Sequence, residues 1–399
     1  SRCRMPTEST FFFAGLLFLA AALGYVFARF GDLDDEDEQR DASRSNFLQG
    51  FRYLLNEEPD RAVEAFTTGS EVDEEAVDTQ VALGALFRRR GELERAIRLH
   101  QNLLDRPGLG TAQRERAMFA LAEDFLGAGL FDRAEELFLR LRDSQYHRTA
   151  ALERLLRICE VTQEWDRAID LCGDLRRVDA GAVQPLQLGH YHCELAERAR
   201  RAGSVAEARA CVAQADALVP GLPRAALIAA DLAADAGDRA GAAGRYWDLL
   251  ESDPTLVSEL LPRLVGVGAV GQGGAAAMAA LERAGNHGSG ALVRLVAALV
   301  STPGVDAATA APFLARYVAA DPVLAPLVDA ESLAIADPVR RQAALDRIRA
   351  ALAAALKATP RYRCGNCGYH SASLQWQCPG CRRWDSVRAT DRILPAPGA

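Results

Sequence analysis

The chain has 399 residues, of which 49% are hydrophobic, 25% charged and 7% aromatic. A formal net charge of −8 excludes a protein whose whole surface attracts nucleic acid, and the length allows two to three domains or one long repeat array. Single cysteines without a disulfide framework predict a reducing compartment; they are Cys159, Cys172, Cys193 and Cys211.

The first predicted element is a membrane-spanning helix at residues 9–28, which carry no charge. At 1.5 Å per residue the segment is about 30 Å long, which matches the hydrocarbon core of a bilayer. A cleaved signal peptide is the alternative, but it would export the thiols. Counted from Met5, basic residues only follow the span, as Arg29, Arg40 and Arg44. The positive-inside rule therefore predicts a single-pass protein with its bulk in the cytoplasm, and residues 29–45 are predicted to be a charged linker.

Residues 46–358 are predicted to form a solenoid of tetratricopeptide-type helix pairs. VALGALFRRRGELERAIRLHQNLL (81–104) has a leading Leu-Gly pair, a turn glycine and a small alanine at the offsets of one unit. The alanine returns at intervals of 34, 38, 34, 40 and 34 residues, as Ala62, Ala96, Ala134, Ala168, Ala208 and Ala242. Pro107, Pro220 and Pro254 are expected to stop second helices. A bundle of unrelated helices would not repeat these residues in phase.

Weaker copies are predicted around Ala276 and at 309–322, and a helix at 338–358 is expected to cap the array. In such solenoids the first helices of the pairs line a groove that holds peptides or protein segments. The array therefore predicts a binding protein with no chemistry of its own.

Three stretches resemble catalytic motifs. GVGAVG (266–271) has the spacing of a dinucleotide loop, but its helical context favours loop glycines. His190 and His192 point to different faces of a helix, which predicts half-buried packing residues and no shared ion. Glu135 and Glu136 are predicted to be exposed helix charges. No enzyme is predicted.

Residues 359–388 are predicted to be a metal-binding domain, followed by a flexible tail at 389–399. Two C-x-x-C pairs supply four thiolates, from Cys364, Cys367, Cys378 and Cys381, which would close a tetrahedral site around one structural zinc or iron ion. A redox-active pair is the lesser alternative. Gly368 and Gly380 are expected to permit the tight turns.

The aromatic residues of this domain are Tyr362, Tyr369, Trp376 and Trp384. We expect them to pack over the site or against the last helices, because so short a segment has little else to bury. Arg382 and Arg383 keep a second reading open, a nucleic-acid-associated zinc ribbon, although the acidic body argues against it.

The order of span, repeats and four-cysteine knuckle resembles the lipopolysaccharide assembly protein B family of Gram-negative bacteria. The resemblance is strongest in LGALFRRRGELERAIRLHQNLL, GLFDRAEELF, EWDRAID, YHCELA and YRCGNCG…WQCPGCRRW. It implies an all-α solenoid with an N-terminal transmembrane helix in the inner membrane, and a rubredoxin-like knuckle packed on the repeats. Metal ligation carries over to the same four cysteines.

The resemblance also implies a role as an adaptor that brings the committed-step lipid A deacetylase to a membrane AAA+ protease. Other lipopolysaccharide assembly proteins are further implied partners. No nucleic acid is expected, a homo-oligomer is left open, and an exported envelope assembly factor is the alternative. The chain departs from the family in an alanine- and glycine-rich region at 265–300.

Overall fold

A computed structural model describes residues 74–269 and 362–389 continuously, with isolated positions between 50 and 64 and between 337 and 350. The predicted membrane segment 9–28, the linker 29–45 and the weaker repeats around Ala276 and at 309–322 lie outside the described residues. So do much of the capping helix 338–358 and nearly all of the tail. Among the helices that are described, none is long and apolar enough to cross a bilayer.

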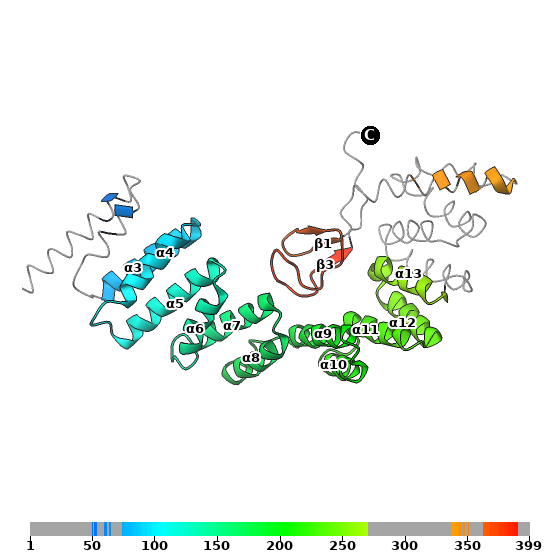
Figure 1. Cartoon of the computed structure of the whole chain (residues 1–399), viewed down its shortest axis with the longest axis horizontal. Coiled ribbons are helices and arrows are strands. Elements are labelled where there is room, and N and C mark those ends of the chain that lie inside the picture. Colours follow the sequence, from blue (N-terminus) through cyan, green and yellow to red (C-terminus); the bar gives the residue numbers. More distant parts are fainter. Residues whose placement is uncertain are drawn as a thin grey trace, which may run out of the picture. The chain divides into compact units, whose positions relative to one another are not determined.

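The described residues before 270 form short helices that follow one another along the chain (Figure 1). The chain divides into two compact units, residues 1–162 and 163–399. The first unit contains α3 (Glu74–Arg89), α4 (Leu93–Leu104), α5 (Thr111–Gly127), α6 (Phe131–Arg140) and α7 (Arg148–Thr162). The second contains α8 (Trp165–Val178), α9 (Pro185–Arg201), α10 (Val205–Leu218), α11 (Pro223–Asp235), α12 (Arg239–Ser252), η1 (Pro254–Leu256) and α13 (Val257–Gly266).

The helices pack as pairs, α3 with α4, α5 with α6, α9 with α10 and α11 with α12. Each predicted alanine within the described residues is the fourth residue of a second helix and is fully buried, at Ala96, Ala134, Ala168, Ala208 and Ala242. A methyl group at this point lets the neighbouring helix approach closely. Second helices α4, α10 and α12 end shortly before the predicted prolines. The predicted phase of the repeat is therefore confirmed.

A residue with positive φ turns the chain between the two helices of a pair. Gly91, Gly129, Gly203 and Gly237 have φ values of 81°, 73°, 76° and 82°, and glycine adopts this conformation without steric cost. The position lies two residues before each second helix. Before α8 it is held by Gln163, with a φ of 60°. The turn before α8 therefore has a positive φ like the other turns, but at a glutamine where the others have glycine.

A buried charged cluster ties three helices of the first unit together. Asp124 of α5 is fully buried; it accepts a hydrogen bond from Arg88 Nη1 at 2.5 Å and contacts His100 Nδ1 at 2.5 Å. The His100 ring fills the space beside Gly84, where an added Cβ would lie 2.3 Å from ring atoms. The leading Leu-Gly pair of this repeat therefore has a glycine because the histidine ring occupies the place of a side chain.

Residues 362–389 form a small antiparallel sheet, called the ribbon below. Its strands are β1 (Tyr362–Cys364), β2 (His370–Ser371) and β3 (Val387–Ala389), in the spatial order β2-β1-β3. Tyr362 pairs with Ser371 on one side and with Ala389 on the other. The core of the ribbon consists of four buried side chains, those of Tyr362, Cys364, Cys378 and Val387. Two of the four are cysteines, so the ribbon has few apolar groups with which to hold itself together.

Candidate metal centre and its docking on the helices

The four predicted cysteines converge at one point of the ribbon. Their sulfur atoms all lie within 4.8 Å of one another, and the Sγ–Sγ distance is 3.6 Å for both Cys364–Cys381 and Cys367–Cys378. Zinc at about 2.3 Å from each sulfur would place tetrahedral sulfurs roughly 3.8 Å apart. The four cysteines could therefore hold one metal ion, and the donor set suits zinc or iron equally.

Two turns with the same backbone plan present the thiols. In the first, the N–H of Gly368 bonds the C=O of Cys364 at 3.0 Å, and in the second the N–H of Arg382 bonds the C=O of Cys378 at 2.8 Å. Gly368 has a φ of 78° and Arg382 a φ of 60°. The expectation that Gly380 supplies this conformation in the second turn is wrong, because Arg382 supplies it.

Gly380 serves close packing instead. A Cβ at this position would lie 3.4 Å from the Sγ of Cys367 and 3.6 Å from Tyr369, which is ordinary contact with a sulfur that must stay close to its three neighbours. Larger side chains at position 380 would crowd the cluster.

Hydrogen bonds favour the thiolate form of two cysteines. The pKa of Cys364 is lowered to about 5, chiefly by Ser386, whose Oγ lies 3.4 Å from the Sγ. The pKa of Cys381 is lowered mainly by a backbone N–H. The pKa of Cys367 is raised to about 11, because a backbone hydrogen bond from Tyr369, which lowers it, is outweighed by burial and the neighbouring thiols. A bound cation would let all four thiols lose their protons.

Trp384 anchors the ribbon on helices of the second unit. Its ring stacks on His190 of α9, with centroids 4.9 Å apart and an interplanar angle of 16°. Its centroid also lies 6.0 Å from that of Trp165, at the start of α8, and 5.8 Å from that of Tyr191. The expectation that this aromatic residue packs on the metal site or the last helices is wrong, because α8 and α9 supply the flat partners for its ring.

A charged group lies beside the second tryptophan. Arg224, at the start of α11, is almost fully buried and donates hydrogen bonds to Glu194 at 2.8 Å and Glu197 at 3.1 Å. Its guanidinium carbon is 5.8 Å from the centre of the Trp376 ring, within the range of a cation–π contact. The Trp376 ring also lies 6.1 Å from His190. Both tryptophans of the ribbon therefore contact first helices of pairs.

His190 is buried in an environment that keeps it neutral. Its pKa is lowered to about 4, first by burial and then by the positive charge of Arg224. Within the described part of the chain, neither ring nitrogen has a hydrogen-bond partner. A buried polar atom without a partner costs free energy, so this residue makes the junction between ribbon and helices less stable than its ring contacts alone suggest.

A third contact comes from strand β1 of the ribbon. The Tyr362 hydroxyl donates a hydrogen bond to Glu259 of α13 at 2.7 Å. The ribbon thus contacts α9 and α11, the first helices of two successive pairs, together with the start of α8 and with α13. This is the face on which the sequence predicts a groove for other proteins, and the chain's own ribbon covers part of it.

The other predicted residues lie apart from the metal centre. His190 is fully buried, more than the half-buried state expected for it, while His192 is partly exposed. Glu136 is exposed and pairs with Arg140, as predicted for a helix charge, whereas Glu135 is partly buried and not exposed as predicted. Helix α13 ends at Gly266, so a helix precedes GVGAVG, where a dinucleotide site needs a strand.

Sequence reasoning did not single out Trp165, Arg224 or Glu259 as partners of the ribbon. Their spacing is that of ordinary repeat residues, so nothing in the pattern marks them. The available signal was the clustering of flat rings in two successive helices, at Trp165, His190 and Tyr191, on a chain that is otherwise poor in aromatic residues.

The paired helices with their buried alanines, together with the four-cysteine ribbon, define a tetratricopeptide-repeat protein that carries a rubredoxin-like zinc ribbon. Residues 362–389 match the family described as the rubredoxin metal binding domain. Over 380 residues the chain is 30% identical to the lipopolysaccharide assembly protein B of Escherichia coli strain K12, covering 94% of this chain and 96% of that protein. The chain belongs to the lipopolysaccharide assembly protein B family.

Proteins of two other bacteria are also similar to the chain. The chain is 29% identical over 384 residues to the lipopolysaccharide assembly protein B of Haemophilus influenzae, with coverage of 94% of this chain and 96% of the relative. Among solved structures, a tetratricopeptide repeat protein from Parabacteroides merdae is 14% identical, with a TM-score of 0.30, and the match covers 64% of this chain and 99% of that one.

Proposed function

We propose that the chain is a membrane-anchored adaptor without catalytic activity that regulates lipopolysaccharide biosynthesis. It presents the committed-step lipid A deacetylase to a membrane AAA+ protease, with its bulk on the cytoplasmic side of the inner membrane. The observation that carries this proposal is the similarity to lipopolysaccharide assembly protein B over 94% of the chain. That similarity runs through both the helix pairs and the ribbon.

We also propose that Cys364, Cys367, Cys378 and Cys381 ligate one structural zinc or iron ion. Four protein ligands leave no open position for a substrate or an activated water. The ion would stabilise the ribbon, which has a core of four side chains, and would not take part in a reaction. Without it, the ribbon has too little apolar surface to stay folded.

The contacts of the ribbon support an adaptor over a nucleic-acid-binding ribbon. Base stacking needs free aromatic faces, whereas Trp384 is stacked on His190 and Trp376 lies beside His190 and Arg224. Arg388, a further cation of the ribbon, is held by Asp385 at 2.7 Å. These groups are engaged within the chain and are not presented to a nucleic acid.

The proposal is tested by following the half-life of the lipid A deacetylase in cells that lack this chain. We expect the deacetylase to persist, and the wild-type chain supplied from a plasmid to restore its degradation. Affinity capture from membranes should recover both the deacetylase and the protease. Normal turnover of the deacetylase without the chain, or recovery of RNA in place of the two enzymes, would refute the adaptor role.

The membrane arrangement is tested separately with reporter fusions. A reporter that is active only in the cytoplasm, fused after residue 399, should be active, and deletion of residues 9–28 should release the chain from the membrane fraction. Activity of a periplasmic reporter at the same place would favour the exported assembly factor.

A further inference from the structure

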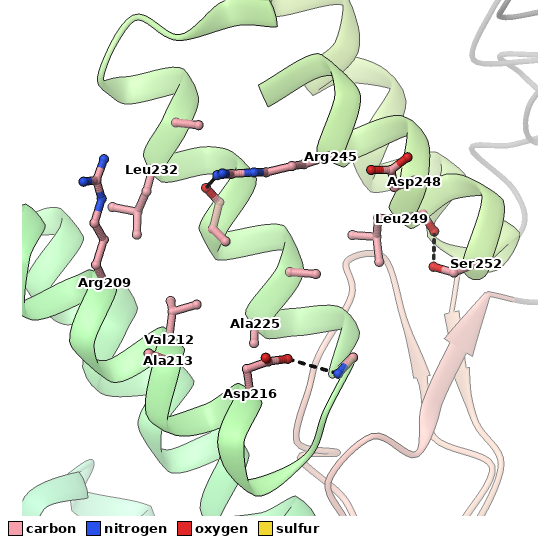
Figure 2. Close-up of a pocket in the computed structure, with 14 residues that line it drawn as sticks. Arg209, Val212, Ala213, Asp216, Ala225, Leu232, Arg245, Asp248, Leu249 and Ser252 are labelled. Carbon is pink, nitrogen blue, oxygen red and sulfur yellow. Dashed lines mark hydrogen bonds between the residues drawn. The ribbon is translucent and has the colours of Figure 1, made fainter. Parts of the chain in front are cut away.

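The second unit has a hollow of about 920 Å³ among α10, α11 and α12 (Figure 2). Alanines of α11, among them Ala225 and Ala229, line it together with residues of the two flanking helices, and Arg245 donates a hydrogen bond to the C=O of Ala229 at 3.2 Å. The described residues do not identify an occupant for this hollow. The contacts of one hydroxyl group of the ribbon, that of Ser386, do specify a role.

Ser386 lies between the two turns that present the cysteines. It stands directly before β3 and two residues after Trp384. Its backbone C=O accepts a hydrogen bond from the N–H of Gly365, in the first turn, at 2.8 Å. Its hydroxyl donates to the C=O of Arg383, directly after the second turn, at 2.9 Å, and its Oγ lies 3.4 Å from the Sγ of Cys364. One side chain therefore contacts a metal-ligand sulfur of the first turn and the backbone that follows the second.

The Ser386 hydroxyl has one hydrogen and two acceptors within reach. In the structure the hydrogen is donated to the C=O of Arg383, and the thiol of Cys364 is the donor toward Oγ. A cysteine that ligates a metal does so as a thiolate, which has no hydrogen and only accepts. The contact between Cys364 and Ser386 is then kept only when the hydroxyl turns its own hydrogen toward the sulfur.

This rotation leaves the backbone hydrogen-bonded. The C=O of Arg383 also accepts the N–H of Cys378 at 3.0 Å, so it keeps one hydrogen bond after the hydroxyl has turned away. A hydrogen bond to a charged acceptor is about twice as strong as one between neutral groups. The exchange of acceptor therefore favours the ligated form of Cys364.

We propose that Ser386 is a positioning residue of the metal centre, and that its hydroxyl hydrogen moves from the Arg383 carbonyl to the Cys364 sulfur when an ion is bound. The inference rests on the four-cysteine ligation proposed above. Loss of a group that hydrogen-bonds a metal ligand typically costs about 10- to 100-fold in metal affinity. Ser386 thus sets how firmly the ion is held, from a position outside both C-x-x-C pairs.

The test compares two variants of the full-length chain with the same shape at position 386. Threonine keeps the hydroxyl, whereas valine replaces it with a methyl group. The metal-free proteins are titrated with zinc ions in competition with a chromophoric chelator. We expect Ser386→Thr to bind zinc within about threefold of the wild type, and Ser386→Val to bind it at least about tenfold more weakly than Ser386→Thr. Equal zinc affinities of the two variants would overturn the role of the hydroxyl.

A spectroscopic measurement separates a hydrogen bond to the sulfur from a general loss of stability. Cobalt(II) in place of zinc gives sulfur-to-metal charge-transfer absorption, and a hydrogen bond to the sulfur raises the energy of that absorption because it stabilises the sulfur lone pair. With excess cobalt, the absorption of Ser386→Val should lie at longer wavelength than that of the wild type, and Ser386→Thr should restore it. Ser386→Ala, which removes the hydroxyl without adding bulk, should shift it in the same direction. An absorption that stays in place in all three variants would overturn the proposal.

Ser373→Ala is the matched control. Ser373 is exposed on the ribbon, and its hydroxyl oxygen accepts a hydrogen bond from Gln375 at 2.9 Å. Its loss should leave the zinc affinity and the cobalt spectrum unchanged, and an effect as large as that of Ser386→Val would contradict a specific role for Ser386. A wild-type chain that binds neither ion would overturn the metal centre itself. A wild-type chain that binds both, with Ser386→Val indistinguishable from it, would overturn the role of Ser386 alone.

Discussion

At the scale of single residues, Gly84 and His100 show why the α3–α4 pair requires a glycine at one position of the repeat. The histidine ring reaches over the glycine to contact buried Asp124. The glycine could be recognised in the sequence as part of the repeat, because its offset is that of the motif. The histidine could not, because its partner Asp124 lies in the next helix pair and no spacing rule links them.

We predict that Gly84→Ala destabilises the first unit by about 1–3 kcal/mol, because the new methyl must displace the His100 ring. Hydrogen exchange of α3 and α4 would measure the change, since it reports each part of a repeat array separately. Gly173→Ala in α8 is the control. No atom lies within 4 Å of its added methyl, so that change should be neutral or stabilise the helix by up to about 1 kcal/mol. Equal effects of the two changes would contradict the steric explanation.

Gln163 occupies the turn position that glycine holds in the other described pairs, with a φ of 60°. We predict that Gln163→Gly stabilises the α7–α8 turn by about 1 kcal/mol, because a left-handed conformation costs a residue with a Cβ roughly that much. Slower hydrogen exchange in the helices on either side of the turn would show the gain.

The reverse change provides the control for this prediction. Gly203 has a φ of 76° and nothing within 4 Å of an added Cβ, so Gly203→Ala tests backbone strain without a steric clash. It should destabilise its turn by a similar amount. If Gln163→Gly also destabilised its turn, strain at residue 163 would not be the explanation.

At the scale of elements, the ribbon depends on its cysteines more than on its core. Cys378 is fully buried, and it belongs both to the sulfur cluster and to the apolar core of the ribbon. We predict that Cys378→Ser abolishes binding of the metal ion and unfolds the ribbon, while the helical circular dichroism signal is retained. Elemental analysis of protein purified without added metal would measure the loss and would identify the ion in the wild-type chain.

Cys211→Ser serves as the control, because Cys211 is partly exposed on α10 and lies outside the cluster. It should keep the full metal content. A Cys378→Ser variant with one ion per chain and an unchanged ribbon would show that the other three sulfurs suffice.

The sequence predicted some elements more accurately than others. The C-x-x-C spacing identified the four cysteines because a metal site imposes local geometry on the chain, and the alanine phase identified the helix pairs because each pair repeats the same contact. The second turn of the ribbon was assigned to Gly380, although Arg382 adopts the positive φ. Glycine is the residue usually expected at a positive φ. The sequence therefore gives no indication that Arg382 adopts one in the turn of the metal site.

At the scale of the whole molecule, the docking of the ribbon was the least predictable feature. Trp384 stacks on His190, yet the two residues are far apart in the sequence and belong to different kinds of structure. A large aromatic side chain such as Trp384 predicts that other residues bury it, but composition alone does not identify those residues. The resemblance to a family supplied the general expectation of packing on the repeats, and the structure supplies the residues.

We predict that acidification weakens this docking. The pKa of His190 is lowered to about 4 when the ribbon is docked, against about 6.5 for a free histidine. The released form therefore gains a proton below pH 6.5 that the docked form does not accept until near pH 4. Docking should be fully stable above pH 6.5 and should weaken by up to about tenfold for each unit between pH 6 and 5. Limited proteolysis before Tyr362 and tryptophan fluorescence would follow the release.

The groups that face His190 are also charged, namely Arg224, Asp385 and Arg388, with Glu194 and Glu197 paired to Arg224. The comparison is made between pH 6.5 and pH 5. His190→Gln should remove most of the pH dependence in that range, whereas His192→Gln, on another face of α9, should retain it. Release that is equally steep in the His190→Gln variant would assign the effect to other groups.

The bond between Tyr362 and Glu259 joins positions 103 residues apart in the sequence, and this separation bears on how the family can change in length. The sequence predicts further repeats and a capping helix in this interval, and a solenoid can gain or lose a helix pair without disturbing distant pairs. Insertions or deletions between α13 and the ribbon should therefore be tolerated during evolution, provided that both anchoring surfaces survive. We expect related chains to differ most in length within this interval and least within the ribbon.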